Sequence, residues 1–178
     1  MHNLLHSFDD RVTAWIQAWP AWLYQPMLAI TNAGQPLTVI IFASGLLVWA
    51  LWQRQTKLAL TGGVILATII VTSILKLILR RSRPETEYVA NMMFQSFSFP
   101  SGHSAAATVE FGFLAYAALM NLPQPWNIVV GVVVAVFGLL VCLSRIYLGA
   151  HFPSDVLGGI LLGLAGLGFI IFVVRPFA

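Results

Sequence analysis

Charge is the property that this sequence lacks most. Only 8% of its 178 residues are Asp, Glu, Lys or Arg, whereas 59% are hydrophobic, and the mean hydropathy is +0.87. A soluble domain carries about 25% charged residues, so this chain cannot cover itself with a water-facing surface. The composition therefore excludes a soluble protein and predicts one that is embedded in lipid.

Cysteine and concentrated basic charge are scarce as well. The single cysteine, Cys142, lies within an apolar run and cannot form an internal disulfide. The net charge is only +3, without a basic block that would indicate a nucleic-acid partner. The start of the chain has neither the basic segment nor the cleavage site of a signal peptide. We find no repeat or linker and expect a single domain over residues 1–178.

Long charge-free runs predict the membrane segments. A spanning helix needs roughly 20 mostly apolar residues, and lipid offers no partner for unpaired backbone groups, so the spans are expected to be helices. We predict an all-α, polytopic membrane protein with six transmembrane helices. The first ends near Asn32, and the others cover 36–52, 58–79, 101–120, 127–143 and 152–174.

An amphipathic segment precedes the first span. Apolar residues recur every three to four positions from Leu4 to Trp19, and Asp9, Asp10 and Arg11 stand between them. This period is typical of a helix with one apolar face. We expect an N-terminal amphipathic helix that lies in the membrane interface.

Six spans would place two polar loops, 80–100 and 144–152, on one membrane face. Cytoplasmic segments usually carry the excess of Lys and Arg, but the count here is close to a tie. One face carries Arg11, Arg54, Lys57 and Arg175, against Arg80, Arg81, Arg83 and Arg145 on the other. If the second set is kept for function, the first marks the cytoplasm. We therefore expect a plasma-membrane protein whose polar loops face the periplasm or the exterior.

Basic residues gather near the first polar loop. Lys76 and Arg83 are seven positions apart, two helical turns, and should project on one side. An ammonium and a guanidinium both suit phosphate oxygens, although basic residues that extend toward lipid headgroups at a helix end explain the same pattern. Arg80 could join such a site, whereas Arg81 should point toward headgroups.

The segment Phe99-Pro100-Ser101-Gly102-His103 opens the next predicted helix. Ser101 is a good N-cap, and Gly102 allows a ligand to approach the backbone closely. Free N–H groups and the helix dipole make such a start an anion site. Taken alone, this segment is explained more simply as an ordinary helix start beside a polar histidine.

The second polar loop contains Arg145, His151 and Asp155. The histidine and the aspartate are four positions apart, so they share a face if the helix begins near His151, and Pro153 is tolerated in a first turn. A carboxylate that holds one imidazole nitrogen leaves the other free as a nucleophile. A capping aspartate beside an incidental histidine is the alternative. That alternative weakens because three segments on one face each supply part of a phosphoryl-transfer site.

The three motifs together resemble the signature of the type 2 phosphatidic acid phosphatase superfamily. The pattern is Lys76, six residues, Arg83-Pro84; then Pro100-Ser101-Gly102-His103; then Ser144-Arg145, five residues, His151, three residues, Asp155. The resemblance implies an enzyme in which His151 attacks phosphorus and forms a phosphohistidine while Asp155 orients it. It implies that His103 protonates the leaving oxygen and then activates water. The phosphate ligands that it implies are Lys76, Arg83, Arg145, Ser101 and Gly102, without a metal or another cofactor.

The expected substrate is a lipid phosphate that arrives through the bilayer. Undecaprenyl diphosphate and phosphatidylglycerophosphate are the leading candidates, and phosphatidic acid and a lipid A phosphate remain open. A phosphotransferase that moves the phosphoryl group to a second lipid would use the same residues. A membrane transporter with an anion-binding pocket is a non-enzymatic alternative, but its polar residues should run through the bilayer rather than gather at one face.

Two further features stay open. Glu110 lies seven positions after His103 and could support it, although a hydrogen bond between spans is the simpler reading. The stretch 92–99 alternates aromatic and polar residues, and it could form an interfacial lid or pack as an ordinary loop.

Overall fold

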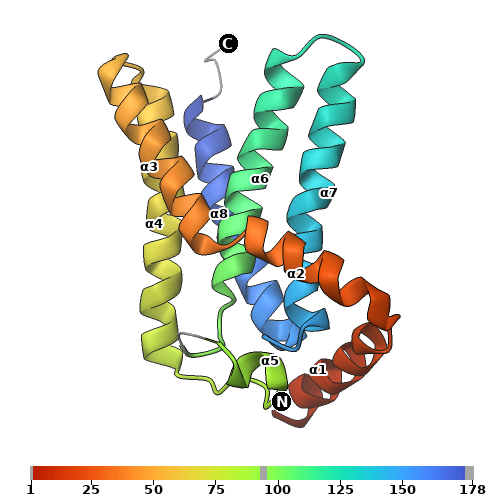
Figure 1. The fold of residues 1–178 in the computed structure, drawn as a ribbon. Helices are drawn as coiled ribbons and strands as arrows, with labels where there is room; N and C mark the ends of the chain where they lie inside the picture. The colour runs from red at the N-terminus through yellow and green to blue at the C-terminus, as the bar shows by residue number, and fades with distance from the viewer. Residues whose placement is uncertain (1, 93–95, 175–178) are drawn as a thin grey trace.

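The computed structural model describes residues 2–92 and 96–174, and its regular elements are all helical (Figure 1). The helices are α1 (His2–Gln17), the 3₁₀ helix η1 (Ala21–Leu23), α2 (Tyr24–Ala33), α3 (Pro36–Trp52), α4 (Thr56–Leu79), α5 (Glu87–Ala90), α6 (Gly102–Asn121), α7 (Trp126–Tyr147) and α8 (Pro153–Val174). The described part of the chain contains no strand. The prediction of an all-α protein is confirmed.

The six-span count is not confirmed. Four segments of the described chain are long and apolar enough to cross a membrane: 21–52, α4, α7 and α8. The predicted first span is only the ten-residue helix α2, about 15 Å long at 1.5 Å per residue, against a hydrocarbon core of about 30 Å. A turn at Gly34 separates α2 from α3, so the apolar segment 21–52 is not one continuous helix. Figure 1 shows α2 lying across the longer helices rather than alongside them.

Helix α6 lies among the other long helices, although it is not one of the four apolar candidates. It contacts α3, α4, α7 and α8, and its small residues Ala105, Ala106 and Ala107 are fully buried. Glycines of α8 allow the close approach. A Cβ on Gly159 would lie 2.5 Å from the Ser101 carbonyl oxygen. Small residues at such contacts let helix backbones approach each other closely.

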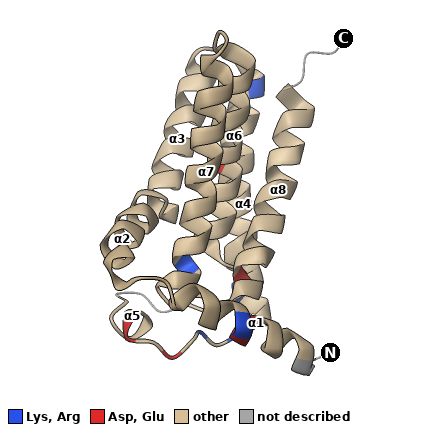
Figure 2. Cartoon of the chain, turned by 90° about the vertical axis from the view of Figure 1, so that its right-hand side faces the viewer, with Lys and Arg blue, Asp and Glu red and all other residues tan. Residues whose placement is uncertain are grey.

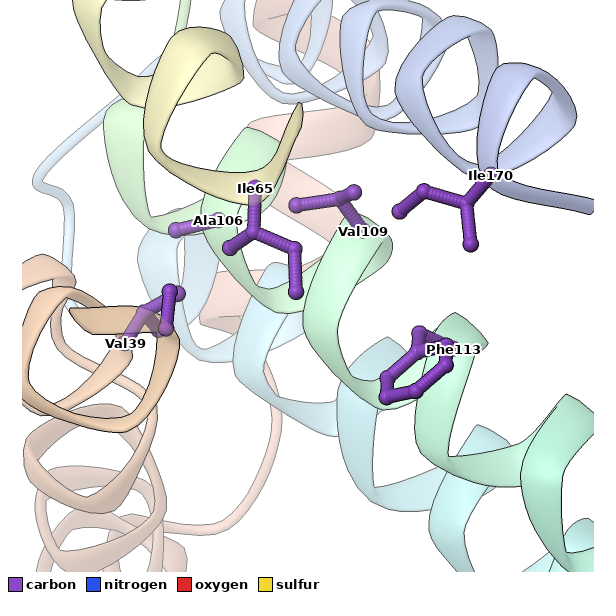
Figure 3. Packing of buried hydrophobic residues seen from close by; sticks show 7 residues of the cluster. Val39, Ile65, Ala106, Val109, Phe113 and Ile170 are labelled. Carbon is purple, nitrogen blue, oxygen red and sulfur yellow. The ribbon is translucent and has the colours of Figure 1, made fainter. Parts of the chain in front are cut away.

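A hydrophobic cluster joins four of the long helices (Figure 3). Its largest buried members come from α3, α4, α6 and α8, and they are Val39, Ile65, Val109, Phe113 and Ile170. Many other large apolar side chains face outward, among them Ile41, Leu77 and Leu161, each more than 60% exposed. An apolar outer surface is what lipid-facing helices require.

Both predicted polar loops lie at one end of the long helices. The C-terminal ends of α4 and α7 and the N-terminal ends of α6 and α8 meet there (Figure 1). Charged residues gather at this end around α1 and α5, whereas the long helices carry little charge (Figure 2). The prediction that the two loops share one side is therefore confirmed.

Helix α1 also lies at this end. Ile16 packs in a cluster with Cys142, Ile146 and Val156 of α7 and α8. Arg11 is predicted on the opposite face, and this prediction is wrong, because α1 packs on α7 and α8 at this end. The predicted first span corresponds to the ten-residue α2, which is too short to return α1 to the other face. The near-tie of basic residues that sets the predicted orientation therefore changes, and Arg175 lies outside the described residues.

Candidate active site

The segment between α7 and α8 brings two predicted catalytic side chains together. The backbone N–H groups of Ala150 and His151 donate to the Arg145 carbonyl at 2.9 and 3.1 Å, which folds the loop back onto the end of α7. Helix α8 begins at Pro153, so His151 precedes the helix instead of standing in its first turn. Its Nδ1 still lies 3.5 Å from Oδ2 of Asp155, and both side chains are buried.

The contacts of the His151 ring indicate its tautomer. Nη1 of Arg83 lies 3.2 Å from Nε2 of His151, and a guanidinium can only donate. In this arrangement Nε2 carries the lone pair, and the ring proton is assigned to Nδ1, on the side of Asp155. An imidazole held in this way presents Nε2 as a nucleophile.

The surroundings of His151 favour its neutral form. Burial lowers the pKa of the ring well below its ordinary value, and the positive charges of Arg83, Arg145 and Lys76 lower the pKa further. The side chain is 2% exposed. The ring is therefore unprotonated at neutral pH, as a nucleophile has to be.

Asp155 is fully buried, and both of its carboxylate oxygens accept hydrogen bonds. Oδ2 accepts from the backbone N–H of Phe152 at 2.9 Å and from the hydroxyl of Ser98. Oδ1 accepts from Nη1 of Arg81 at 2.7 Å. The carboxylate is thus fixed from several directions, which fixes the imidazole beside it.

Lys76 and Arg83 converge on this region, but not through the helical spacing that we expected. Helix α4 ends before Arg80, which takes a left-handed conformation with φ 48°. Arg83 therefore lies in the following loop, where its Nη1 donates to the Ala150 carbonyl at 2.9 Å. Nζ of Lys76 donates to the Phe97 carbonyl at 2.6 Å. The polar loop, rather than a shared helix face, brings the two cations to one place.

Arg145 is the third cation, and it is 1% exposed. Its Nη1 donates to Oγ1 of Thr31 at 2.6 Å and lies 3.3 Å from the hydroxyl of Tyr88. Its Nε is buried without a hydrogen-bond partner among the described residues. A buried donor without an acceptor is costly, and a bound anion would supply one.

The start of α6 follows the expected capping pattern. Oγ of Ser101 accepts from the N–H of Ser104 at 3.4 Å. The N–H of Ser101 itself donates to the Asp155 carbonyl at 2.9 Å, so this amide is already engaged and is a poor candidate for a phosphate donor. Gly102 remains a good one. A Cβ added there would lie 3.8 Å from Cε of Lys76, so its backbone lies beside a phosphate-binding candidate.

Two cavities adjoin these residues from different sides. One, of about 1020 Å³, is lined mainly by polar side chains of α2, α5 and α7, and it contains His103 and Arg145. The other, of about 670 Å³, lies against α3 and α4 and is lined by apolar residues such as Ile69 and Leu77, together with Lys76, Arg83 and Gly102. His151 is close enough to His103 to act on it electrostatically.

Several residues behave differently from the expectation. Arg80 is exposed, and its Nε donates to the nearby Leu77 carbonyl at 3.0 Å, away from the site. Arg81 was expected to meet headgroups, but it forms ion pairs of 2.7 Å with both Asp9 and Asp155. Glu110 is 7% exposed in α6, and its supporting role stays a prediction.

The sequence reasoning missed Asp9, Arg81, Ser98, Thr31 and Tyr88 as neighbours of the site. Asp9 and Ser154, which are hydrogen-bonded, stand 145 positions apart, and a single sequence carries no signal of such a contact. Of the possible lid at 92–99, residues 93–95 lie outside the described part of the chain. The described residues Phe97 and Ser98 contact Lys76 and Asp155 and so line the site.

Comparison with known proteins finds relatives over most of this chain. The profile of the PAP2 superfamily matches residues 56–177. The chain is 33% identical to phosphatidylglycerophosphatase B of Bacillus subtilis, over 98% of this chain and 85% of that protein. It is 28% identical to the undecaprenyl-diphosphatase BcrC of the same organism, over 77% of this chain and 72% of that protein. The crystal structure of the transmembrane PAP2-type phosphatidylglycerolphosphate phosphatase from Bacillus subtilis superposes with a TM-score of 0.78 at 28% identity, covering 99% of this chain and 90% of the other.

Proposed function

Because this chain belongs to the PAP2 superfamily of membrane phosphatases, we propose that it hydrolyses a lipid phosphate or diphosphate through a phosphohistidine on His151. The contacts of the two ring nitrogens of His151 are the main support for this proposal. Nε2 lies 3.2 Å from Arg83, and Nδ1 lies 3.5 Å from Asp155. One nitrogen is thus held by a carboxylate while the other sits where a cation would also hold phosphate oxygens.

In the first step, Nε2 of His151 attacks the phosphorus, and the bond from phosphorus to the lipid oxygen breaks. The negative charge of the bound phosphate favours a protonated His103. His103 gives this proton to that oxygen, so the lipid leaves as an alcohol or, from a diphosphate, as a monophosphate. Asp155 stabilises the positive charge that develops on the imidazole. Lys76, Arg83 and Arg145 stabilise the charge on the equatorial phosphate oxygens, and the N–H of Gly102 adds a donor.

In the second step, water attacks the phosphorus, and the bond from phosphorus to Nε2 breaks. His103, now neutral, takes a proton from that water and is ready to act as an acid again. The products are inorganic phosphate and free His151. The polar cavity that His103 and Arg145 line supports water as the acceptor, in preference to a second lipid.

No metal takes part in this proposal. A metal in phosphoryl transfer neutralises the charge on the phosphate oxygens, and three cations can supply that charge here. All three lower the pKa of His151, so all three act electrostatically at the site. Activity should therefore survive a chelator.

Undecaprenyl diphosphate and phosphatidylglycerophosphate are the substrates that we favour. Relatives named for each are 28% and 33% identical to this chain. The cavity against α3 and α4 has apolar walls and reaches Lys76 and Arg83, so it suits a lipid whose tail stays in the bilayer while its phosphate enters the site. The same reading makes the chain one membrane domain, with α1 in the interface and the site toward the periplasm or the exterior.

A substrate panel tests the function. Purified protein would be assayed for phosphate release from undecaprenyl diphosphate, phosphatidylglycerophosphate and phosphatidic acid, with and without chelator. We expect release from at least one lipid, no effect of chelator, and complete loss in His151→Ala. If His151→Ala kept wild-type activity, the phosphohistidine would be ruled out, and loss of activity on chelation would rule out the metal-free mechanism.

A further inference from the structure

Asp9 of α1 reaches the site from the far N-terminal part of the chain. Its side chain is 1% exposed. Oδ2 accepts from Nη2 of Arg81 at 2.7 Å and from the hydroxyl of Ser154 at 2.7 Å, while Oδ1 accepts from the backbone N–H of Ser154 at 2.8 Å. Both carboxylate oxygens are thus engaged in a buried setting, where a charge is costly without such partners.

Arg81 connects this carboxylate to Asp155. Its Nη1 donates to Oδ1 of Asp155 at 2.7 Å and to the hydroxyl of Ser154 at 2.6 Å. The guanidinium also lies over the ring of Phe152, 4.5 Å from the centroid. One cation therefore stands between two carboxylates, and its position is set by α1, by α8 and by the ring next to His151.

The charges of Asp155, Arg81 and Asp9 explain why Asp9 is useful to the site. With Asp9 present, the positive charge of Arg81 is shared between two carboxylates. Without Asp9, the charge of Arg81 would be balanced by Asp155 alone. Arg81 would then attract more strongly the carboxylate that holds His151. Asp155 would then stabilise the developing imidazolium less well.

We propose that Asp9 is a positioning residue of the active site, and that it acts on His151 through Arg81 and Asp155. Helix α1 is then a working part of the site and not only a membrane anchor. This inference rests on the phosphatase reaction proposed above, and it names a residue outside the three sequence motifs.

Asp9→Asn is the test, because it removes the charge and keeps the shape. Asp10→Asn is the matched control, since Asp10 is the next residue on α1 and is exposed. We expect kcat of Asp9→Asn to fall about tenfold, as for other residues that orient a catalytic ligand, with little change in KM. Asp10→Asn should match the wild type.

The pH profile separates positioning from a purely structural role. Removing a negative charge near Asp155 should make His151 harder to protonate and move the acidic limb of kcat/KM to lower pH. The other charged or titratable groups around His151 are Lys76, Arg81, Arg83, His103, Arg145 and Asp155, and all stay in the variant. A structural defect would reduce the amount of folded enzyme without moving that limb.

If Asp9→Asn folds poorly, a double-variant cycle with Arg81→Gln still tests the role of Asp9. If Asp9 works by sharing the charge of Arg81, adding Asp9→Asn to Arg81→Gln should cost less activity than it does in the wild type. Strictly additive losses, or a wild-type kcat and pH profile in Asp9→Asn, would overturn the role of Asp9 while the phosphatase function stands. No phosphate release by the wild type from any lipid would instead remove the proposed function, and this inference with it.

Discussion

Nη1 of Arg83 lies 3.2 Å from Nε2 of His151 and 2.9 Å from the carbonyl oxygen of Ala150. One guanidinium thus contacts the proposed nucleophilic nitrogen and the backbone immediately before it. A phosphorus atom bonded to Nε2 would place its oxygens against the same guanidinium. Arg83 therefore links the position of the nucleophile to the position of the phosphate.

Replacing Arg83 by lysine should cost about a hundredfold in kcat/KM, even though the charge is kept. Nε of Arg83 donates to the Ser96 carbonyl at 2.7 Å, and Nη1 donates to the Ala150 carbonyl. A lysine lacks the forked guanidinium that can bind these two carbonyls and the phosphate at the same time. Steady-state kinetics on the preferred lipid would measure the loss. Arg80→Lys is the control, because Arg80 is exposed and should tolerate the change. Equal activity of the two variants would contradict the assignment.

His103→Gln should show a defect that depends on the leaving group. With a lipid substrate, loss of the general acid should lower kcat by about 10²–10⁴-fold. With an aryl phosphate, whose leaving oxygen needs no proton, the first step should be largely restored while the attack by water stays slow. A phosphorylated enzyme should then accumulate, and acid-labile ³²P on the protein would reveal it. His6→Gln, on the exposed side of α1, serves as the control. If the two substrates were affected equally, His103 would not be the acid.

The acidic limb of the kcat/KM profile should lie below the ordinary histidine pKa of 6.5. Burial and the neighbouring cations lower the pKa of His151, so the neutral nucleophile persists at pH values where an exposed histidine is protonated. Arg83→Gln removes one of these positive charges and should move the limb to higher pH. The same shift affects stability: the unfolded chain binds a proton more readily than the folded one, so His151 reduces the free energy of unfolding as pH falls below about 6.5. A limb that moved to lower pH in Arg83→Gln would refute this account.

Gly159→Ala should destabilise the protein by about 1–3 kcal/mol, the usual range for overpacking. The new Cβ would lie 2.5 Å from the Ser101 carbonyl oxygen, which belongs to backbone and cannot turn aside. α8 would have to move away from the start of α6, and activity should fall along with the unfolding temperature. Gly168→Ala is the control on the same helix, where a Cβ meets nothing within 4 Å. Thermal unfolding in detergent would compare the two variants.

Short separations along the chain and the alternating direction of successive helices explain what could be predicted from the sequence. His151 and Asp155 share a short segment, so their contact survives even though α8 begins two residues after the histidine. The common end of the two polar loops follows from the alternation of the four helices α4, α6, α7 and α8. These inferences depend on neighbours in the chain or on counting crossings.

The rest depended on contacts that no local pattern encodes. The Asp9–Arg81 pair joins residues 72 positions apart, and the left-handed turn at Arg80 sends Arg83 into the loop rather than along the helix. The apolar residues of α2 predict part of a span, but the helix has only ten residues and packs against α7 with Met27 buried.

The lining of the apolar cavity against α3 and α4 includes Leu77, an outward-facing residue that is 64% exposed. Beyond Leu77, a long isoprenoid or acyl chain would meet the fluid bilayer, so the enzyme would have no means of measuring how long the chain is. Discrimination among lipids would then have to arise within the first few carbons and the headgroup.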